Sequence, residues 1–99
     1  MEKWRDAAAV NVIVHTKRVL LLDKLEIDRD FMSYFNEVLT SHEMDYIRTR
    51  STRLQRAKSF IDTLAMKLTT EVFYDLLCAL PNALRKEVYQ AYRIGKNDF

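Results

Sequence analysis

Glycine and proline, the residues that most often interrupt regular structure, each occur once in the 99 residues of this chain. All-β sandwiches and barrels need turn residues roughly every 8–12 positions, and this chain cannot supply them. Helices need only short connections with Ser, Thr or Asp caps, which it has. Hydrophobic residues make up 48% of the sequence, which is enough for a core. The sequence therefore predicts one all-α domain over residues 1–99 and excludes that the chain as a whole is a disordered segment.

Hydrophobic spacing predicts six helices packed as an antiparallel bundle. The first begins after Asp6, and a polar group at residues 15–18 separates its two apolar stripes, so we expect a bend there. Thr40 and Glu43 form a capping box at the start of the third helix. The predicted helices span about 7–25, 28–38, 41–49, 52–68, 70–80 and 81–92, and residues 93–99 form a tail.

The apolar faces of these helices predict the core. The fourth helix has the most regular pattern, with Leu54, Ala57, Phe60, Ile61, Leu64, Ala65 and Leu68 on one face. The aromatic residues at core spacing are Phe31, Tyr34, Phe35, Phe60, Phe73 and Tyr74. Cys78 is the only cysteine, so an internal disulfide is excluded. We expect it to be a buried thiol in a helix, because unpaired cysteine is usually buried.

Residue patterns that would indicate catalysis, metal binding or membrane insertion are missing from the sequence. The two histidines, His15 and His42, have no cysteine or carboxylate pair at ligand spacing, and there is no glycine-rich phosphate loop. No apolar run approaches the ~20 residues of a membrane span. The charged first residues do not resemble a signal peptide. We therefore expect a cytoplasmic, non-enzymatic protein with no metal, cofactor or membrane partner.

Charge is balanced in total but separated along the sequence. The net charge of +2 argues against a dedicated nucleic-acid binder. Residues 48–58 include several basic and no acidic side chains, whereas residues 23–45 are mainly acidic. Most such runs are simply solvated helix surfaces. The alternative is that an acidic and a basic surface lie on different sides of one domain, which would allow head-to-tail docking.

A series of short motifs, in order along the chain, resembles a known family. The motifs are Val-Leu-Thr at 38–40, Glu43, Ile-Arg at 47–48, Thr52, Gln-Arg-Ala-Lys at 55–58, Phe-Ile-Asp-Thr-Leu at 60–64 and Phe-Tyr-Asp-Leu-Leu at 73–77. Together they resemble the caspase recruitment domain (CARD) of the death-fold superfamily, with residues 15–25 similar to its bent first helix. The resemblance covers residues 7–92 and is strongest to the apoptosome-adaptor and initiator-caspase members.

The resemblance implies a non-enzymatic module that binds another CARD-containing protein, either a caspase or an apoptosome- or inflammasome-type adaptor. It also allows self-assembly. In this family a basic surface of the first and fourth helices often binds an acidic surface of the second and third. The predicted basic surface consists of Lys17, Arg18, Arg50, Arg53, Arg56 and Lys58. The predicted acidic surface consists of Glu26, Asp28, Asp30 and Glu37.

Other interpretations stay open. A CARD-only decoy or regulator would carry the same surfaces, and other death-fold classes share the helix count. A helical nucleic-acid binder would use residues 48–58 and would show salt-dependent binding to DNA or RNA. Under the CARD interpretation, we expect Arg53→Glu or Arg56→Glu to weaken partner binding and to leave the fold intact.

Overall fold

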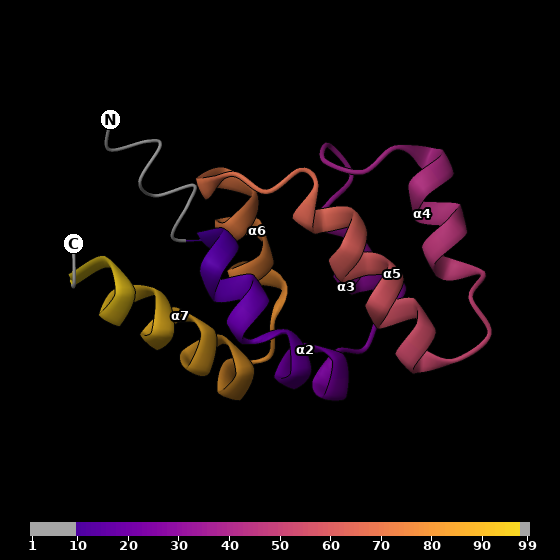
Figure 1. The fold of residues 1–99 in the computed structure, drawn as a ribbon. Coiled ribbons are helices and arrows are strands. Elements are labelled where there is room, and N and C mark those ends of the chain that lie inside the picture. The colour runs from indigo at the N-terminus through magenta and orange to yellow at the C-terminus, as the bar shows by residue number, and fades with distance from the viewer. Residues whose placement is uncertain (1–9, 98–99) are drawn as a thin grey trace.

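The computed structural model describes the backbone of residues 10–97 and the side chains of residues 10–93, and this part of the chain is helical without strands. After a helical segment described over residues 10–16, the helices are α2 (Arg18–Lys24), α3 (Arg29–Ser33), α4 (Ser41–Arg48), α5 (Arg53–Ala65), α6 (Thr70–Ala79) and α7 (Asn82–Asn97). α4 and α7 lie at opposite ends of the molecule (Figure 1). None of the described helices is long and apolar enough to cross a bilayer.

The break predicted within residues 15–18 lies at Lys17, whose backbone leaves the helical region at φ −93° and ψ 9°. The Leu21 N–H still donates to the Lys17 carbonyl at 2.9 Å, so the chain passes directly into α2. The two segments run in different directions (Figure 1). The predicted start of this helix, at Ala7 with Asp6 as N-cap, lies outside the described residues.

The start predicted for the third helix from its capping box is confirmed, and the helices predicted to begin near residues 28, 52 and 70 also begin beside capping side chains. Asp28, Thr40, Thr52 and Thr69 each accept a hydrogen bond from a backbone N–H three residues later. At Thr40 the capping box is complete, because its own N–H donates to a Glu43 carboxylate oxygen at 2.8 Å. Each cap satisfies a backbone donor that the helix leaves unpaired, which typically contributes about 1 kcal/mol.

The C-terminal end of α6 is closed by a side chain from α7. The Arg85 guanidinium donates to the carbonyl oxygens of Leu77 at 2.7 Å, Leu80 at 2.9 Å and Cys78 at 3.2 Å. These are carbonyls at a helix end, where intrahelical donors are lacking and positive charge is favourable. Arg85 therefore fixes the sharp connection between α6 and α7 at Pro81.

Two helices end earlier than predicted. α3 ends at Ser33, and residues 34–38 form turns in which Phe35 N–H bonds Met32 O and Val38 N–H bonds Phe35 O, both at 3.0 Å. Hydrophobic spacing does not separate such tight turns from an α-helix. α5 ends at Ala65, three residues before the predicted end, although Leu68 is still buried.

The predicted C-terminal tail is wrong for residues 93–97, because α7 continues through Gly95 to Asn97. A single glycine lowers the stability of a helix by about 1 kcal/mol relative to alanine but does not end it. The sequence contains no proline near Gly95 that would stop the helix.

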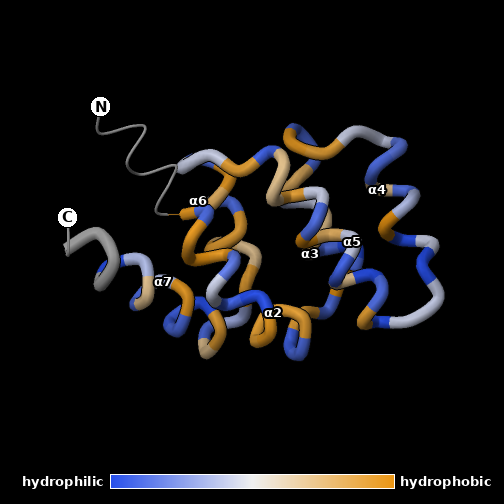
Figure 2. The backbone as a smooth tube through the Cα atoms, in the orientation of Figure 1, coloured by the Kyte–Doolittle hydropathy of each residue, from blue (hydrophilic) through white to orange (hydrophobic). Residues whose placement is uncertain are grey.

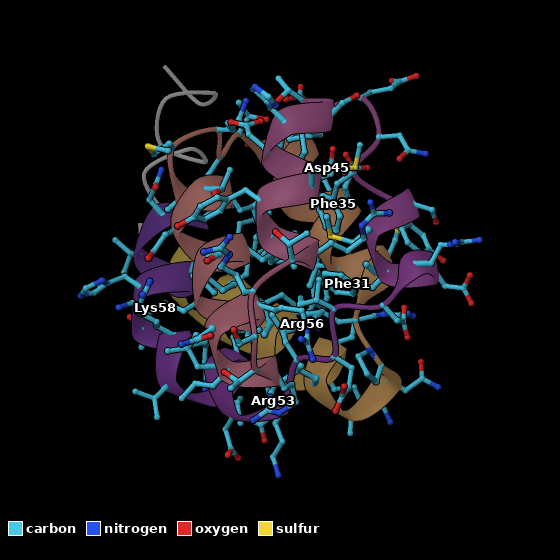
Figure 3. The ribbon with its side chains drawn as sticks, turned by 90° about the vertical axis from the view of Figure 1, so that its right-hand side faces the viewer. Phe31, Phe35, Asp45, Arg53, Arg56 and Lys58 are labelled. Atoms are coloured by element: carbon cyan, nitrogen blue, oxygen red, sulfur yellow. The ribbon has the colours of Figure 1, made fainter. Side chains whose placement is uncertain are left out.

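The core is organised around α5, which packs against both α2 and α4. The Phe60 ring lies 5.0 Å from the Phe31 ring and 4.9 Å from the Phe35 ring between centroids, in edge-to-face arrangements. Phe31 and Phe35 occupy the interior in Figure 3. Residues along α6 are mainly hydrophobic, and those along α4 mainly hydrophilic (Figure 2). α6 is accordingly buried along one face, with Phe73 and Leu76 fully inside.

Five residues predicted to be buried lie at the surface: Tyr34, Leu54, Ala65, Tyr74 and Cys78. The two tyrosines keep their hydroxyl groups near water while part of each ring packs inside, which is common for this residue. Leu54 and Ala65 lie at the two ends of α5, where neighbouring helices no longer cover the helix. Cys78 lies one position beyond the buried face of α6.

Glu43 joins the start of α4 to the segment after α5. One of its carboxylate oxygens lies 3.0 Å from Lys67 Nζ. The pKa of Glu43 lies below its ordinary value, chiefly because the Thr40 N–H bonds the carboxylate and secondly because of the bond with Lys67. The folded state therefore favours the charged form. The charged Glu43 carboxylate therefore stabilises the fold. This contribution is complete above the unfolded pKa of 4.5 and is lost as the pH falls through the lower pKa of the folded state.

Glu43→Gln is therefore expected to be less stable than the natural chain at pH 7, with a difference that shrinks as the pH falls below about 4.5. Glutamine keeps the capping bond but not the charge. Urea unfolding of both proteins at a series of pH values between 7 and 3 measures this difference. Lys67→Met should leave a reduced pH dependence, because the Thr40 bond remains. If the stability difference between Glu43→Gln and the natural chain does not vary with pH, the charged form of Glu43 does not stabilise the fold.

Candidate functional site

Two of the predicted basic residues meet at the connection between α4 and α5. Arg56 Nη1 donates to the Arg50 carbonyl at 3.0 Å. Arg50 itself lies over the Tyr46 ring, 3.9 Å from its centroid, and its Nε donates to the Tyr46 carbonyl at 2.9 Å. The ring face and the carbonyl hold the guanidinium group in place without neutralising it. This connection therefore carries two guanidinium groups whose positions are set by contacts within the chain.

Arg53 ties the start of α5 to the end of α2. Its Nη1 donates to the carbonyls of Leu22 at 3.1 Å and Leu25 at 3.0 Å. Both carbonyls lie at the C-terminal end of α2, where a cation compensates the unpaired acceptors. At the other end of the helix pair, Arg18 lies 2.7 Å from Asp62, so the two helices run antiparallel. The expectation that Arg53→Glu leaves the fold intact is therefore revised, because Arg53 has a structural role.

Lys17 and Arg18 contribute less positive charge than the sequence suggested. Lys17 Nζ lies 3.6 Å from a Glu87 carboxylate oxygen, and Arg18 pairs with Asp62. These pairs are partly exposed, so each contributes little to stability. They nevertheless place a negative charge beside each cation. The positive potential of the predicted basic surface therefore comes mainly from its other four residues.

Lys58 is exposed and forms no ion pair with any residue whose side chain is described. In Figure 3 it lies at one edge of the molecule, apart from Arg53 and Arg56. Within the described chain, Arg50, Arg53, Arg56 and Lys58 all lack a carboxylate partner. We call these four residues the cationic surface. Its members are spread over the α4–α5 connection and α5 and are not gathered in one compact patch.

Three of the four predicted acidic residues, Glu26, Asp28 and Asp30, line a shallow hollow of about 290 Å³. Asp28 also caps α3, through a 2.8 Å bond from the Phe31 N–H. Glu37 is outside the lining of this hollow. The remaining lining residues are Lys24, Leu25, Phe31, Tyr34, Ala79 and Pro81. We call this site the acidic hollow.

The acidic hollow was not predictable from local sequence, because Ala79 and Pro81 come from a segment some fifty residues away. Tyr34 was assigned to the core, but its side chain is half exposed and lines the hollow. Carboxylates beside an exposed aromatic ring suit a cationic side chain, which would gain both ionic and cation–π contacts. The sequence did contain one indication of this site: two carboxylates, Asp28 and Asp30, lie within six residues of Tyr34.

The acidic hollow and the cationic surface adjoin at the end of α2. Leu25 lines the hollow, and its carbonyl accepts the hydrogen bond from Arg53. The expectation that the two charged surfaces lie on different sides of the domain is therefore not met at this point. Arg53 marks their boundary, and Lys58 is the member of the cationic surface whose side chain forms no hydrogen bond with the described residues.

Comparison with known proteins gave no match: no protein-family model matches the sequence, and no curated protein or solved structure matches it either.

Proposed function

We propose that this chain is a CARD-type homotypic interaction module built on a death-fold bundle. Residues 10–24 would be its bent first helix, and α3 to α7 the other five. The observation that supports the proposal is the combination, on one small helical domain, of four cations without carboxylate partners and a hollow lined by three carboxylates. The motifs at residues 38–77 support the same family.

In the proposed complex, the acidic hollow of one domain binds a basic side chain of its partner, and the cationic surface binds the partner's carboxylates. Such complementarity raises the rate of encounter and selects the partner more than it raises affinity. The chain itself would carry out no reaction and need no cofactor. The partner would be a cytoplasmic CARD-containing caspase or adaptor. Tethering then raises the effective concentration of the proteins that these domains belong to.

Lys58→Glu is expected to weaken partner binding by roughly tenfold, the effect of losing about 1.4 kcal/mol of charge complementarity. Lys58 is exposed and forms no hydrogen bond or ion pair with the described residues, so the fold should be unaffected. Partners are captured from cytosolic extract and identified by mass spectrometry, and the affinity of the recovered partner is then measured. Lys86→Glu, the same charge change at an exposed position of α7, is the matched control.

Recovery of a CARD-containing protein that binds Lys58→Glu more weakly than Lys86→Glu supports the proposal. Equal binding to both variants contradicts a role for the cationic surface. Recovery of partners that include no CARD-containing protein contradicts the family assignment. A decoy or regulator would give the same binding results as an adaptor, and reconstitution of caspase activation with the full-length partner distinguishes the two.

The four cations without carboxylate partners also favour a second candidate, a nucleic-acid binder. That function requires affinity for a DNA or RNA duplex that falls steeply with salt, with a slope set by the number of phosphates contacted. The neighbouring acidic hollow opposes it, since its carboxylates repel phosphates. A fluorescence titration of labelled duplexes at several salt concentrations tests this candidate directly.

A further inference from the structure

The connection between α4 and α5 carries three hydroxyl residues between arginines, in the run Arg-Thr-Arg-Ser-Thr-Arg at residues 48–53. An arginine three positions before a serine or threonine occurs twice in the whole chain, at Arg48–Ser51 and at Arg56–Ser59. A modifying enzyme that binds arginine in an acidic groove could therefore act on either of two serines. These two serines differ in their structural surroundings.

The structure distinguishes Ser51 from its neighbours. The Thr49 hydroxyl donates to the Asp45 carbonyl at 2.8 Å, at the end of α4. The Thr52 hydroxyl accepts from the Gln55 N–H at 3.1 Å, as the cap of α5. Ser51 is exposed, and its hydroxyl forms no hydrogen bond with any described residue. Of these three exposed residues, Ser51 is thus the one whose hydroxyl is not engaged in a hydrogen bond with the described part of the chain.

Ser59 is held differently. It lies inside α5, where its backbone is helical and its side chain is only partly exposed. Entry into an enzyme cleft would require unwinding the helix that carries Phe60, which is fully buried. Ser51 lies in the four-residue connection, outside regular structure. Loop residues of this kind are the ones most readily approached by a modifying enzyme.

We propose that Ser51 is a phosphorylation site for an arginine-directed protein kinase and that its phosphorylation weakens the cationic surface. The kinase would transfer the γ-phosphoryl group of ATP: the bond to the β-phosphate breaks, a bond to Ser51 Oγ forms, the hydroxyl proton passes to a base of the kinase, and ADP leaves. Arg48 and Arg50 are the recognised residues. Among the residues whose side chains are described, Arg48 pairs with Asp45 alone, across an exposed contact that can be exchanged for one with the kinase.

The regulatory part of this inference rests on the proposed function. A phosphoserine carries a charge of about −1.5 to −2 and three strong acceptor oxygens. Arg56 donates to the carbonyl of Arg50, the residue directly before Ser51, so the phosphate would lie near these two members of the cationic surface. Its charge would offset most of the positive charge of that pair. The docking of a partner's carboxylates is then opposed by repulsion.

The first experiment incubates the folded chain with Mg²⁺, ATP and the catalytic subunit of an arginine-directed kinase, and locates phosphate by mass spectrometry. The expected result is one phosphate, on Ser51, that Ser51→Ala abolishes and Ser59→Ala does not. A peptide of residues 46–57 serves as the unfolded reference. Phosphorylation of the peptide but not the folded chain overturns the proposal, because the fold would then hide the site. Failure of both overturns it as well, because the arginines would not be recognised.

The second experiment measures binding of polyglutamate, a probe of the cationic surface that requires no identified partner. Phosphorylated chain is expected to bind it roughly tenfold more weakly than unmodified chain. Equal affinity overturns the regulatory role. These outcomes are separate from those of partner capture. If Ser51 is phosphorylated but no CARD-containing partner is recovered, only the proposed function is contradicted. If Lys58→Glu weakens partner binding but Ser51 is not phosphorylated, only this inference is contradicted.

Discussion

Phe60→Ala is expected to lower the free energy of unfolding by about 3–5 kcal/mol. Phe60 is fully buried in α5, and its ring makes edge-to-face contacts with Phe31 and Phe35. Alanine would remove those contacts and leave a cavity between α3 and α5 that rigid neighbours fill only in part. A loss of this size is a large fraction of the 5–15 kcal/mol that typically stabilises a domain.

Urea denaturation followed by circular dichroism measures the change as a lower midpoint. Leu54→Ala is the matched control, since Leu54 lies in the same helix and is 53% exposed. Its expected effect is within about 0.5 kcal/mol. If Phe60→Ala and Leu54→Ala prove equally stable, α5 does not present the face described here to the core.

Arg53→Glu is expected to lower the free energy of unfolding by about 1.5–3 kcal/mol, the typical range for a hydrogen bond to a charged group. The change removes both bonds from Arg53 to the carbonyls of Leu22 and Leu25. It also brings a carboxylate to the end of α2, where carbonyl oxygens already carry partial negative charge. The contact between α2 and α5 should therefore loosen at this end.

Two further variants separate the causes. Arg53→Met keeps an apolar stem of similar length, so its loss of stability reports the hydrogen bonds with little contribution from packing. Lys58→Glu makes the same change of charge in the same helix, at an exposed side chain that forms no hydrogen bond or ion pair with the described residues. If Arg53→Glu is as stable as Lys58→Glu, then Arg53 does not cap α2, and it becomes available for partner binding.

These results bear on how the cationic surface can be tested. A loss of partner binding in Arg53→Glu would have two explanations, a lost contact or a displaced α2. The same holds in part for Arg56, whose guanidinium bonds the Arg50 carbonyl. Lys58 is the position where loss of binding reports the interface alone.

Local chemistry made some features predictable. Asp28, Thr40, Thr52 and Thr69 cap helices through bonds that reach only three residues along the chain, so their role is visible in the sequence. Hydrophobic periodicity placed Phe60 and Leu64 in the core for the same reason. The end of α3 was not predictable, since tight turns and α-helix share the spacing of Phe31 and Phe35.

Helical structure, the approximate helix starts and most of the core were predictable from local sequence, because each depends on neighbours within one or two turns. The contacts of the charged side chains were not predictable, because they depend on how the helices pack together. Arg53 reaches carbonyls some thirty residues away, and Ala79 and Pro81 complete a hollow with Glu26 and Asp28. A long flexible side chain has the same local pattern whether it faces solvent or another helix end. Its partners are set by which helices pack together, and no local pattern records that.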